Sequence, residues 1–329
     1  MKISIDSPLD MHLHLRQGKM LKQVLPFSAT SFAGAVIMPN LVSPVDDKEK
    51  LFRYLEEITS LCVNEIFKPY MTLFFRSYRK SELEELLNHI IGIKLYPAGV
   101  TTQSESGVSD FSLIEETLSH MQELKIPLLV HGESNGFVME REKEFLQTYD
   151  YIARNFPDLH IVMEHITSAD SVEFLDKFDN VSATVTVHHL MITLDDVVGD
   201  LMQPDMFCKP IAKTPRDRDA LKNAVFNGHQ KLMFGSDSAP HPRHKKECCG
   251  CAAGIFSAPV ALPILAELFD KADKLELLQD FVSGIARKRY NITPPEKTIT
   301  LENKAFRVPL LNGEVKSFLA GKKVAWRIV

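Results

Sequence analysis

The chain has 329 residues and a formal net charge of −5, and its positive charges are spread out, which gives no support for a nucleic-acid partner or an anionic membrane. No stretch approaches the roughly 20 apolar residues of a membrane span, so we expect no membrane partner. Five cysteines in a long chain are typical of reduced thiols, and the first residues show no signal-peptide core, so we expect a cytoplasmic protein.

Short apolar runs alternate with amphipathic helical patterns along most of the chain. Eight runs predict strands over residues 9–15, 33–38, 70–75, 90–95, 126–130, 159–163, 181–187 and 231–234. Apolar spacings of three and four predict helices over residues 47–61, 81–89, 111–124, 140–155, 168–178, 216–228, 260–278 and 275–289. Apolar strands that alternate with helices favour a parallel sheet covered on its outside. Eight such units predict an α/β fold, the (β/α)8 TIM barrel.

The alternative fold is an open doubly wound sheet, which would want a glycine-rich phosphate loop after an early strand. The sequence has no such loop. Residues 298–329 differ from the rest, because their apolar side chains are spaced like those of short extended pieces. We therefore expect a single domain over residues 1–329, with the barrel over about 1–297 and a strand-rich C-terminal extension over 298–329 packed on it.

Polar residues follow seven of the eight apolar runs, at the strand ends where such a barrel carries its active site. In chain order they include His12, His14, Arg16, Asn40, Lys94, His131, Glu133, Glu164, His165, His188, His189, Asp237 and His241. Two histidines two residues apart on a strand point to the same side. Imidazoles and a carboxylate suit zinc, so four histidines and an aspartate at these positions predict a two-metal site.

Lys94 stands among apolar residues of the fourth run, so we expect it to be buried. A buried ammonium costs several kcal/mol unless it is paired. One interpretation is an ion pair with a carboxylate. The other is that the desolvated amine has taken up carbon dioxide, which gives a carbamate with two oxygens that can bridge two cations.

Six segments form a joint pattern: His12-Leu13-His14-Leu15-Arg16, Met38-Pro39-Asn40, Lys94-Leu95-Tyr96-Pro97-Ala98-Gly99, Val130-His131-Gly132-Glu133, Glu164-His165-Ile166-Thr167 and Gly235-Ser236-Asp237-Ser238-Ala239-Pro240-His241. Together they resemble the dihydroorotases of the amidohydrolase superfamily, most closely the shorter bacterial type that occurs as a separate enzyme. The resemblance runs from about residue 4 to residue 260. It implies reversible hydrolysis of the cyclic amide of L-dihydroorotate to N-carbamoyl-L-aspartate, a step of de novo pyrimidine biosynthesis.

The resemblance also implies two Zn2+ ions per subunit, bridged by carboxylated Lys94 and a hydroxide. The metal ligands would be His12, His14 and Asp237 for one ion and His131 and His165 for the other. Asp237 would be the catalytic residue, which moves a proton between the nucleophile and the leaving nitrogen.

The resemblance places several further side chains and backbone groups around a small-molecule substrate. The implied substrate-binding residues are His14, Arg16, Asn40, Thr101, Thr102, His131, Phe207, His241 and Ala252. Arg16 would bind the substrate carboxylate as a bidentate donor. Thr101 and Thr102 would belong to a loop that closes over the substrate, and Phe207 and Ala252 would contribute backbone contacts. The family often forms homodimers, which is the only ground for expecting one here.

Two other functions fit parts of the pattern. A hydantoinase-like or dihydropyrimidinase-like cyclic-amide hydrolase would use the same barrel, but a neutral ring needs no carboxylate clamp such as Arg16, Asn40 and His241. A non-catalytic relative should lack metal ligands, whereas every expected ligand is present here.

The remaining polar features receive plainer interpretations. Cys248, Cys249 and Cys251 lack the paired spacing of a structural zinc site, so we expect a reduced loop. The pair His188 and His189 is interpreted as lining or packing. Glu133 and Glu164 adjoin predicted ligands, and they either orient the imidazoles or are plain strand-end carboxylates. Lys245 and Lys246 are expected to lie on a solvated loop face.

Overall fold

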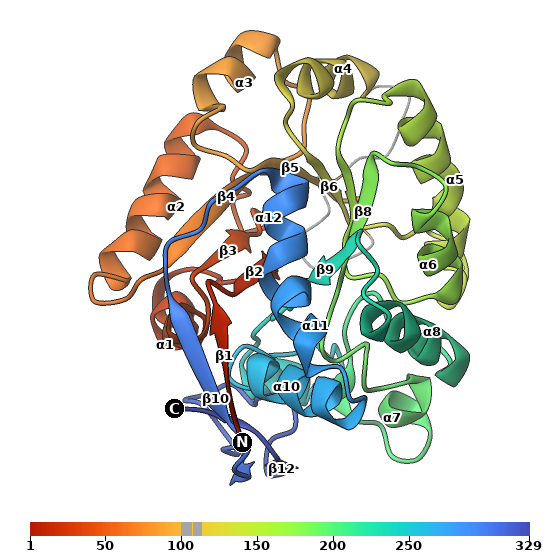
Figure 1. Cartoon of the computed structure of the whole chain (residues 1–329). Coiled ribbons are helices and arrows are strands. Elements are labelled where there is room, and N and C mark those ends of the chain that lie inside the picture. Colours follow the sequence, from red (N-terminus) through yellow and green to blue (C-terminus); the bar gives the residue numbers. More distant parts are fainter. Residues whose placement is uncertain (100–106, 108–113) are drawn as a thin grey trace.

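The structure, a computed structural model, describes residues 1–99, 107 and 114–329. Its centre is a sheet of eight parallel strands in the order in which they occur along the chain (Figure 1). These strands are β2 (Leu9–Leu13), β3 (Gly34–Ile37), β4 (Lys68–Phe74), β5 (Gly92–Leu95), β6 (Leu128–Val130), β7 (Ile161–Met163), β8 (Val181–Val185) and β9 (Leu232–Phe234). Each overlaps one predicted run, so the predicted TIM barrel is confirmed.

The barrel closes where the first and last strands meet. Leu13, at the end of β2, forms a parallel bridge with Ser238, which lies after β9. The backbone N–H of His14 donates to the carbonyl of Ser238 at 3.2 Å, and that of Asp237 donates to the carbonyl of His12 at 2.9 Å. Barrel closure therefore brings the predicted ligands of the first and eighth runs side by side.

Most of the helices surround the sheet on its outside, and the last one lies across an end of the barrel (Figure 1). They are α1 (Gly18–Ser31), α2 (Lys48–Leu61), α3 (Lys80–Leu86), α4 (Glu115–Leu124), α5 (Arg141–Asn155), α6 (Ala169–Leu175), α7 (Leu194–Val198), α8 (Pro215–Phe226), α9 (Arg243–Lys246), α10 (Ala261–Lys271), α11 (Leu275–Gln279) and α12 (Ile285–Tyr290). A short 3-10 helix spans Pro204–Met206, and a π-helical turn, Asp280–Gly284, links α11 to α12. The described part contains no helix that is long and apolar enough to span a membrane.

Helix α1 was not predicted, because it begins at Gly18 and contains Pro26, both of which disfavour a helix. Burial of Leu21, Val24 and Leu25 compensates for these residues. The helix predicted over residues 260–278 is divided between α10 and α11, with Lys274 between them.

Apolar side chains fill the N-terminal half of the barrel interior. Residues paired across parallel strands point to the same face of the sheet, and Leu129 pairs with both Lys94 and Val162. Leu129 and Val162 belong to a buried cluster that also contains Ile285 and Ala286 of α12. Helix α12 thus covers the N-terminal end, and Lys94 faces the barrel interior.

The C-terminal extension is built from short strands, as predicted. β10 (Thr298–Glu302) pairs antiparallel with β1 (Lys2–Asp6) and with β13 (Arg327–Ile328), while β11 (Phe306–Arg307) pairs with β12 (Lys323–Val324). Both chain ends therefore lie together in Figure 1. Trp326 is buried and its Nε1–H donates to Asp270 of α10 at 3.1 Å, so the extension packs on the barrel. The single-domain boundaries stay a prediction.

Candidate active site

The His-x-His pair meets the aspartate of the last strand end. The Nε2 atoms of His12 and His14 are 3.2 Å apart. Asp237 Oδ1 lies 3.1 Å from His14 Nε2 and 3.5 Å from His12 Nε2. All three side chains are buried, and their ligand atoms lie within 4.8 Å of one another. This geometry can hold a metal ion.

A second histidine pair lies against the first. His131 follows β6 and His165 follows β7, and His131 Nδ1 is 3.2 Å from His165 Nε2. The ring centroids of His165 and His12 are 4.9 Å apart. The four histidines predicted at three different strand ends therefore form one buried cluster.

The protonation states of this cluster suit metal ligation. Burial lowers the pKa of His12 to about 4, and it lowers the pKa of His14 and of His165 well below the ordinary value. Neutral imidazoles are the form that binds a metal ion. These three imidazoles therefore offer lone pairs at neutral pH without first having to release protons.

Lys94 is fully buried, and its Nζ has no hydrogen-bond partner among the described residues. No carboxylate of those residues lies within ion-pair distance of it. Burial lowers the pKa of Lys94 to about 8, although Glu164 and Asp237 raise it. The ion-pair interpretation of Lys94 therefore lacks a direct partner, and among the described residues the amine contacts the Tyr96 ring, with 5.2 Å between Nζ and the ring centroid, but no hydrogen-bond acceptor.

Two glutamates orient His12 and His131 through the ring nitrogens that face away from the other histidines. The Nδ1 of His12 is 2.8 Å from Glu164 Oε2, which also accepts from Thr184 Oγ1 at 2.6 Å. His131 Nε2 is 2.8 Å from Glu133 Oε2. Burial by itself would raise the pKa of Glu164, but the neighbouring His12 and Lys94 hold it below the ordinary value. Each carboxylate fixes one ring nitrogen so that the other faces the cluster.

Asp10 has a similar supporting role that the sequence analysis missed. Its side chain is fully buried and accepts hydrogen bonds from the backbone N–H of Ser236 at 2.7 Å and of His12 at 3.2 Å. It thereby joins β2 to the segment that carries Asp237. The available signal was a carboxylate inside an otherwise apolar strand, two residues before His12.

Three site residues have a left-handed backbone conformation that non-glycine residues rarely adopt. The φ angles are +62° at Arg16, +43° at His165 and +42° at Asp237. Such conformations cost about 1–3 kcal/mol each and persist where the surrounding structure enforces them. Their occurrence at three predicted site residues supports a functional role for this end of the barrel.

A small cleft opens beside the first histidine pair. It is lined by His14, Arg16, Asn40, Lys209, Asp237, Ala239, Ala253 and Gly254. The Nη2 of Arg16 lies 3.2 Å from His241 Nε2, and its Nε–H donates to the carbonyl of Pro240 at 3.2 Å. Three predicted substrate-binding side chains, those of Arg16, Asn40 and His241, thus lie at or beside one cleft next to Asp237.

The predicted backbone contacts of Phe207 and Ala252 with a substrate stay a prediction. The N–H of Phe207 donates to Pro204 and that of Ala252 to Lys245, and neither residue lines the cleft. Lys209, Ala253 and Gly254 form that wall instead, and the sequence analysis did not identify them. Thr101 and Thr102 lie outside the described residues.

Lys246 was expected to be solvated, and this expectation is wrong. The side chain is buried, with 5% of its surface exposed, and its Nζ donates to the carbonyl oxygens of Phe207, Ala252 and Gly254. The polar sequence around Lys246 gave no signal of this burial. The neighbouring Lys245 is exposed, as expected.

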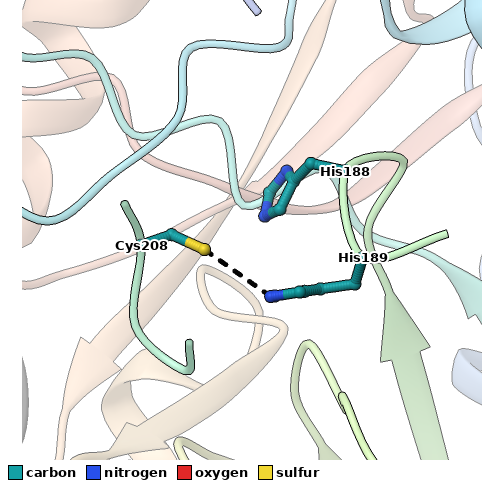
Figure 2. Close-up of side chains that lie close together, drawn as sticks. All are labelled: His188, His189 and Cys208. Atoms are coloured by element: carbon teal, nitrogen blue, oxygen red, sulfur yellow. Dashed lines mark hydrogen bonds between the residues drawn. The ribbon is translucent and has the colours of Figure 1, made fainter. Parts of the chain in front are cut away.

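A second group of potential metal ligands consists of His188, His189 and Cys208 (Figure 2). Cys208 Sγ lies 3.6 Å from His189 Nε2, and His189 already contacts Thr186 Oγ1 at 3.0 Å and the carbonyl of Pro210 at 3.1 Å. Burial lowers the pKa of His188 most, followed by the neighbouring His189 and by the buried positive charge of Lys246. Because a nearby ammonium disfavours a cation, we keep the interpretation that the two histidines are lining or packing residues. The three cysteines at 248, 249 and 251 belong to neither of the two ligand groups found among the described residues.

The barrel and the histidine–aspartate cluster at the C-terminal ends of its strands define a hydrolase of the amidohydrolase type. The chain is 45% identical to the dihydroorotase of Helicobacter hepaticus over 99% of this chain and 97% of that relative, and 40% identical to the dihydroorotase of Helicobacter acinonychis over 100% and 99%. The chain therefore belongs to the dihydroorotase family and is a hydrolase that acts on cyclic amides. No family model matches it.

Solved structures agree with this assignment. A crystal structure of dihydroorotase from Campylobacter jejuni superposes with a TM-score of 0.96 at 48% identity, covering 99% of this chain and 97% of that one. Dihydroorotase from Saccharomyces cerevisiae in complex with 5-fluoroorotic acid gives a TM-score of 0.93 at 32% identity, covering 100% and 98%. An L-hydantoinase from Arthrobacter aurescens gives 0.85 at 16% identity, covering 100% of this chain and 83% of that one, which shows the shared fold alone.

Proposed function

We propose that this chain hydrolyses the cyclic amide of L-dihydroorotate reversibly to N-carbamoyl-L-aspartate, in de novo pyrimidine biosynthesis. The observation that carries the proposal is the cleft, because it joins a metal-ligand cluster to a guanidinium suited to a carboxylate. A ring that carries both a cyclic amide and a carboxylate fits these two parts. The 5-fluoroorotic acid in the yeast structure is a ring acid of this kind.

We infer that two divalent ions, which we take to be zinc, complete the site. His12, His14 and Asp237 would hold one ion and His131 and His165 the other. The buried Lys94 amine that lacks a hydrogen-bond partner fits a carbamate bridge between them, and the neutral imidazoles fit zinc. The chemistry that such ions supply when bound is the activation of water and the polarisation of a carbonyl oxygen.

Asp237 has the position and environment of a proton carrier. Its carboxylate is buried at the cleft and lies 3.1 Å from His14 Nε2. Burial raises the pKa of Asp237, and the neighbouring histidines lower it by less. A carboxylate with a raised pKa can accept the proton of the attacking water and hold it until the ring nitrogen leaves. In ring closure the same group moves the proton in the opposite direction.

Arg16 is proposed to bind the substrate carboxylate, with Asn40 and His241 beside it. Two parallel N–H donors of one guanidinium match the two oxygens of a carboxylate. Asn40 lines the cleft together with His14 and Arg16, so it lies beside both the carboxylate site and the ligand cluster. This placement would hold the ring at a fixed distance from the reacting amide. Contacts from Thr101, Thr102, Phe207 and Ala252, a homodimer, and a cytoplasmic location stay predictions.

Arg16→Met is expected to raise KM for L-dihydroorotate by about 10- to 100-fold, because it removes a bidentate charge-assisted pair. Metal content should stay unchanged, since Arg16 is not among the proposed ligands. Steady-state kinetics and metal analysis of the purified variant make the test. Arg16→Lys keeps the charge without the planar pair of donors, so its KM should lie between those of the wild type and Arg16→Met.

A neutral substrate separates this function from the hydantoinase-like alternative. The wild-type protein should hydrolyse L-dihydroorotate in clear preference to dihydrouracil, which carries the same cyclic amide without the carboxylate. Equal turnover of the two rings, or loss of metal in Arg16→Met, would contradict the role given to Arg16.

A further inference from the structure

Lys246 ends helix α9 inside the loop that follows His241. Its Nζ donates to the carbonyl oxygens of Phe207 at 2.8 Å, Ala252 at 2.9 Å and Gly254 at 2.7 Å. An ammonium group has three N–H donors, so three carbonyls satisfy it completely. No carboxylate among the described residues lies within ion-pair distance of this amine.

These carbonyls come from two segments that are far apart in the sequence. Phe207 directly follows the 3-10 helix, whereas Ala252 and Gly254 follow α9. The N–H of Gly254 also donates to the Phe207 carbonyl at 3.0 Å. Lys246 and this backbone bond together fasten the two segments to each other.

The fastened segments form one wall of the cleft. Ala253 and Gly254 line the cleft together with Lys209, which lies two residues after Phe207. Two of the three bonds of Lys246 therefore hold the residues on either side of Ala253. The position of the Ala253 peptide depends on them directly.

Ala253 is in turn linked to the proposed carboxylate site. Its carbonyl oxygen lies 2.9 Å from His241 Nε2, which lies 3.2 Å from Arg16 Nη2. His241 thus lies between the Ala253 carbonyl and Arg16, and its Nε2 can donate to the carbonyl or accept from the guanidinium, but not both at once.

The Ala253–Gly254 wall also packs closely against the opposite side of the cleft. A Cβ on Gly254, whose φ is +149°, would lie 2.5 Å from the carbonyl oxygen of Ala239, which also lines the cleft. A small displacement of the wall would therefore change the space open to the substrate ring. Binding of the substrate therefore depends on where this wall is held.

We propose that Lys246 is a positioning residue for the substrate, which fixes the Ala253–Gly254 wall of the cleft against Arg16 and His241. This inference rests on the proposed function of the cleft. It differs from a purely stabilising role, because loss of a positioning contact changes the affinity of a folded, metallated enzyme.

The test is Lys246→Met, with Lys245→Met as the matched control on the adjacent, exposed lysine. Methionine keeps much of the length and apolar stem of lysine and removes its three donors. KM for L-dihydroorotate should rise by about tenfold with kcat changed much less. Metal content should equal that of the wild type, and Lys245→Met should leave both constants unchanged.

Lys246→Gln retains an N–H donor pair on a shorter side chain, so its KM should lie between those of the wild type and Lys246→Met. If Lys246→Met does not fold, Lys246→Gln carries the comparison. A folded variant with unchanged KM, or an equal rise in Lys245→Met, would overturn the positioning role. Absence of turnover in the wild-type protein would instead contradict the proposed function itself.

Discussion

Replacement of Lys94 by alanine is expected to lower turnover more than about a hundredfold. Removal of a residue that only hydrogen-bonds to a metal ligand already lowers metal affinity or activity by about 10- to 100-fold. The charge of Lys94 contributes to lowering the pKa of His12, His14 and His165, so its amine lies close to ligands of both proposed ions. A carbamate at this position could reach both. Metal analysis of the purified variant should therefore show loss of at least one ion per subunit.

Two controls make the result specific to the bridge. Lys94→Met retains an apolar side chain of similar length, so it separates loss of the bridge from loss of packing, and it should be as inactive as Lys94→Ala. Acetate or propionate added to Lys94→Ala should restore part of the activity, because a small carboxylate can occupy the space and supply two oxygens. A Lys94→Ala protein with full metal content and full activity would show that the carbamate hypothesis is wrong.

Asp237→Asn is expected to lower kcat by about 100- to 10,000-fold, the contribution typical of general acid–base catalysis. The amide keeps the shape of the side chain and an oxygen near His14, but it cannot accept a proton at neutral pH. Because one group would move the proton in both directions, hydrolysis and ring closure should be impaired by similar factors. Kinetics in each direction, measured on protein of known metal content, make the comparison.

A loss of activity in Asp237→Asn could come from lost proton transfer or from lost metal binding, and metal analysis separates the two. Metal content should be determined for Asp237→Asn and for His12→Asn, which removes a proposed ligand that has no proton-transfer role. Metal-loaded Asp237→Asn should remain inactive. Full activity of that loaded variant in either direction would contradict proton transfer by Asp237.

The barrel could be predicted from the sequence because each central strand is a short, nearly continuous apolar run. Strand β1 could not, since its partner β10 lies almost at the other end of the chain and local patterns do not report such pairing. Helix α1 was missed for a different reason. Tertiary burial outweighs the unfavourable Gly18 and Pro26, and propensity alone cannot show this.

The ligand cluster could be predicted because histidines and carboxylates gather at the C-terminal ends of the apolar strands, where a barrel of this kind carries its site. His12, His165 and Asp237 meet as expected, since closure of the sheet fixes which strand ends are neighbours. Lys246 could not be predicted in the same way. It stands in a polar loop that looks solvated, and its burial depends on carbonyl groups as distant as that of Phe207.

The cleft wall shows a similar limit. Ala253 and Gly254 act through their backbone and through close packing, and such contacts leave little trace in residue type. The choice between Ala252 and its neighbours depends on where one turn places its peptide groups, which periodicity does not determine.

The buried cluster is proposed to bind the metal ions that are needed to hydrolyse L-dihydroorotate. The most direct measurement is turnover of the purified protein on L-dihydroorotate and on N-carbamoyl-L-aspartate, before chelation, after chelation and after addition of zinc. We predict turnover in both directions that is lost with the metal and returns with zinc. Undiminished turnover by protein shown to be free of metal would contradict the account, and a zinc-loaded protein inactive on both compounds would contradict the proposed substrate.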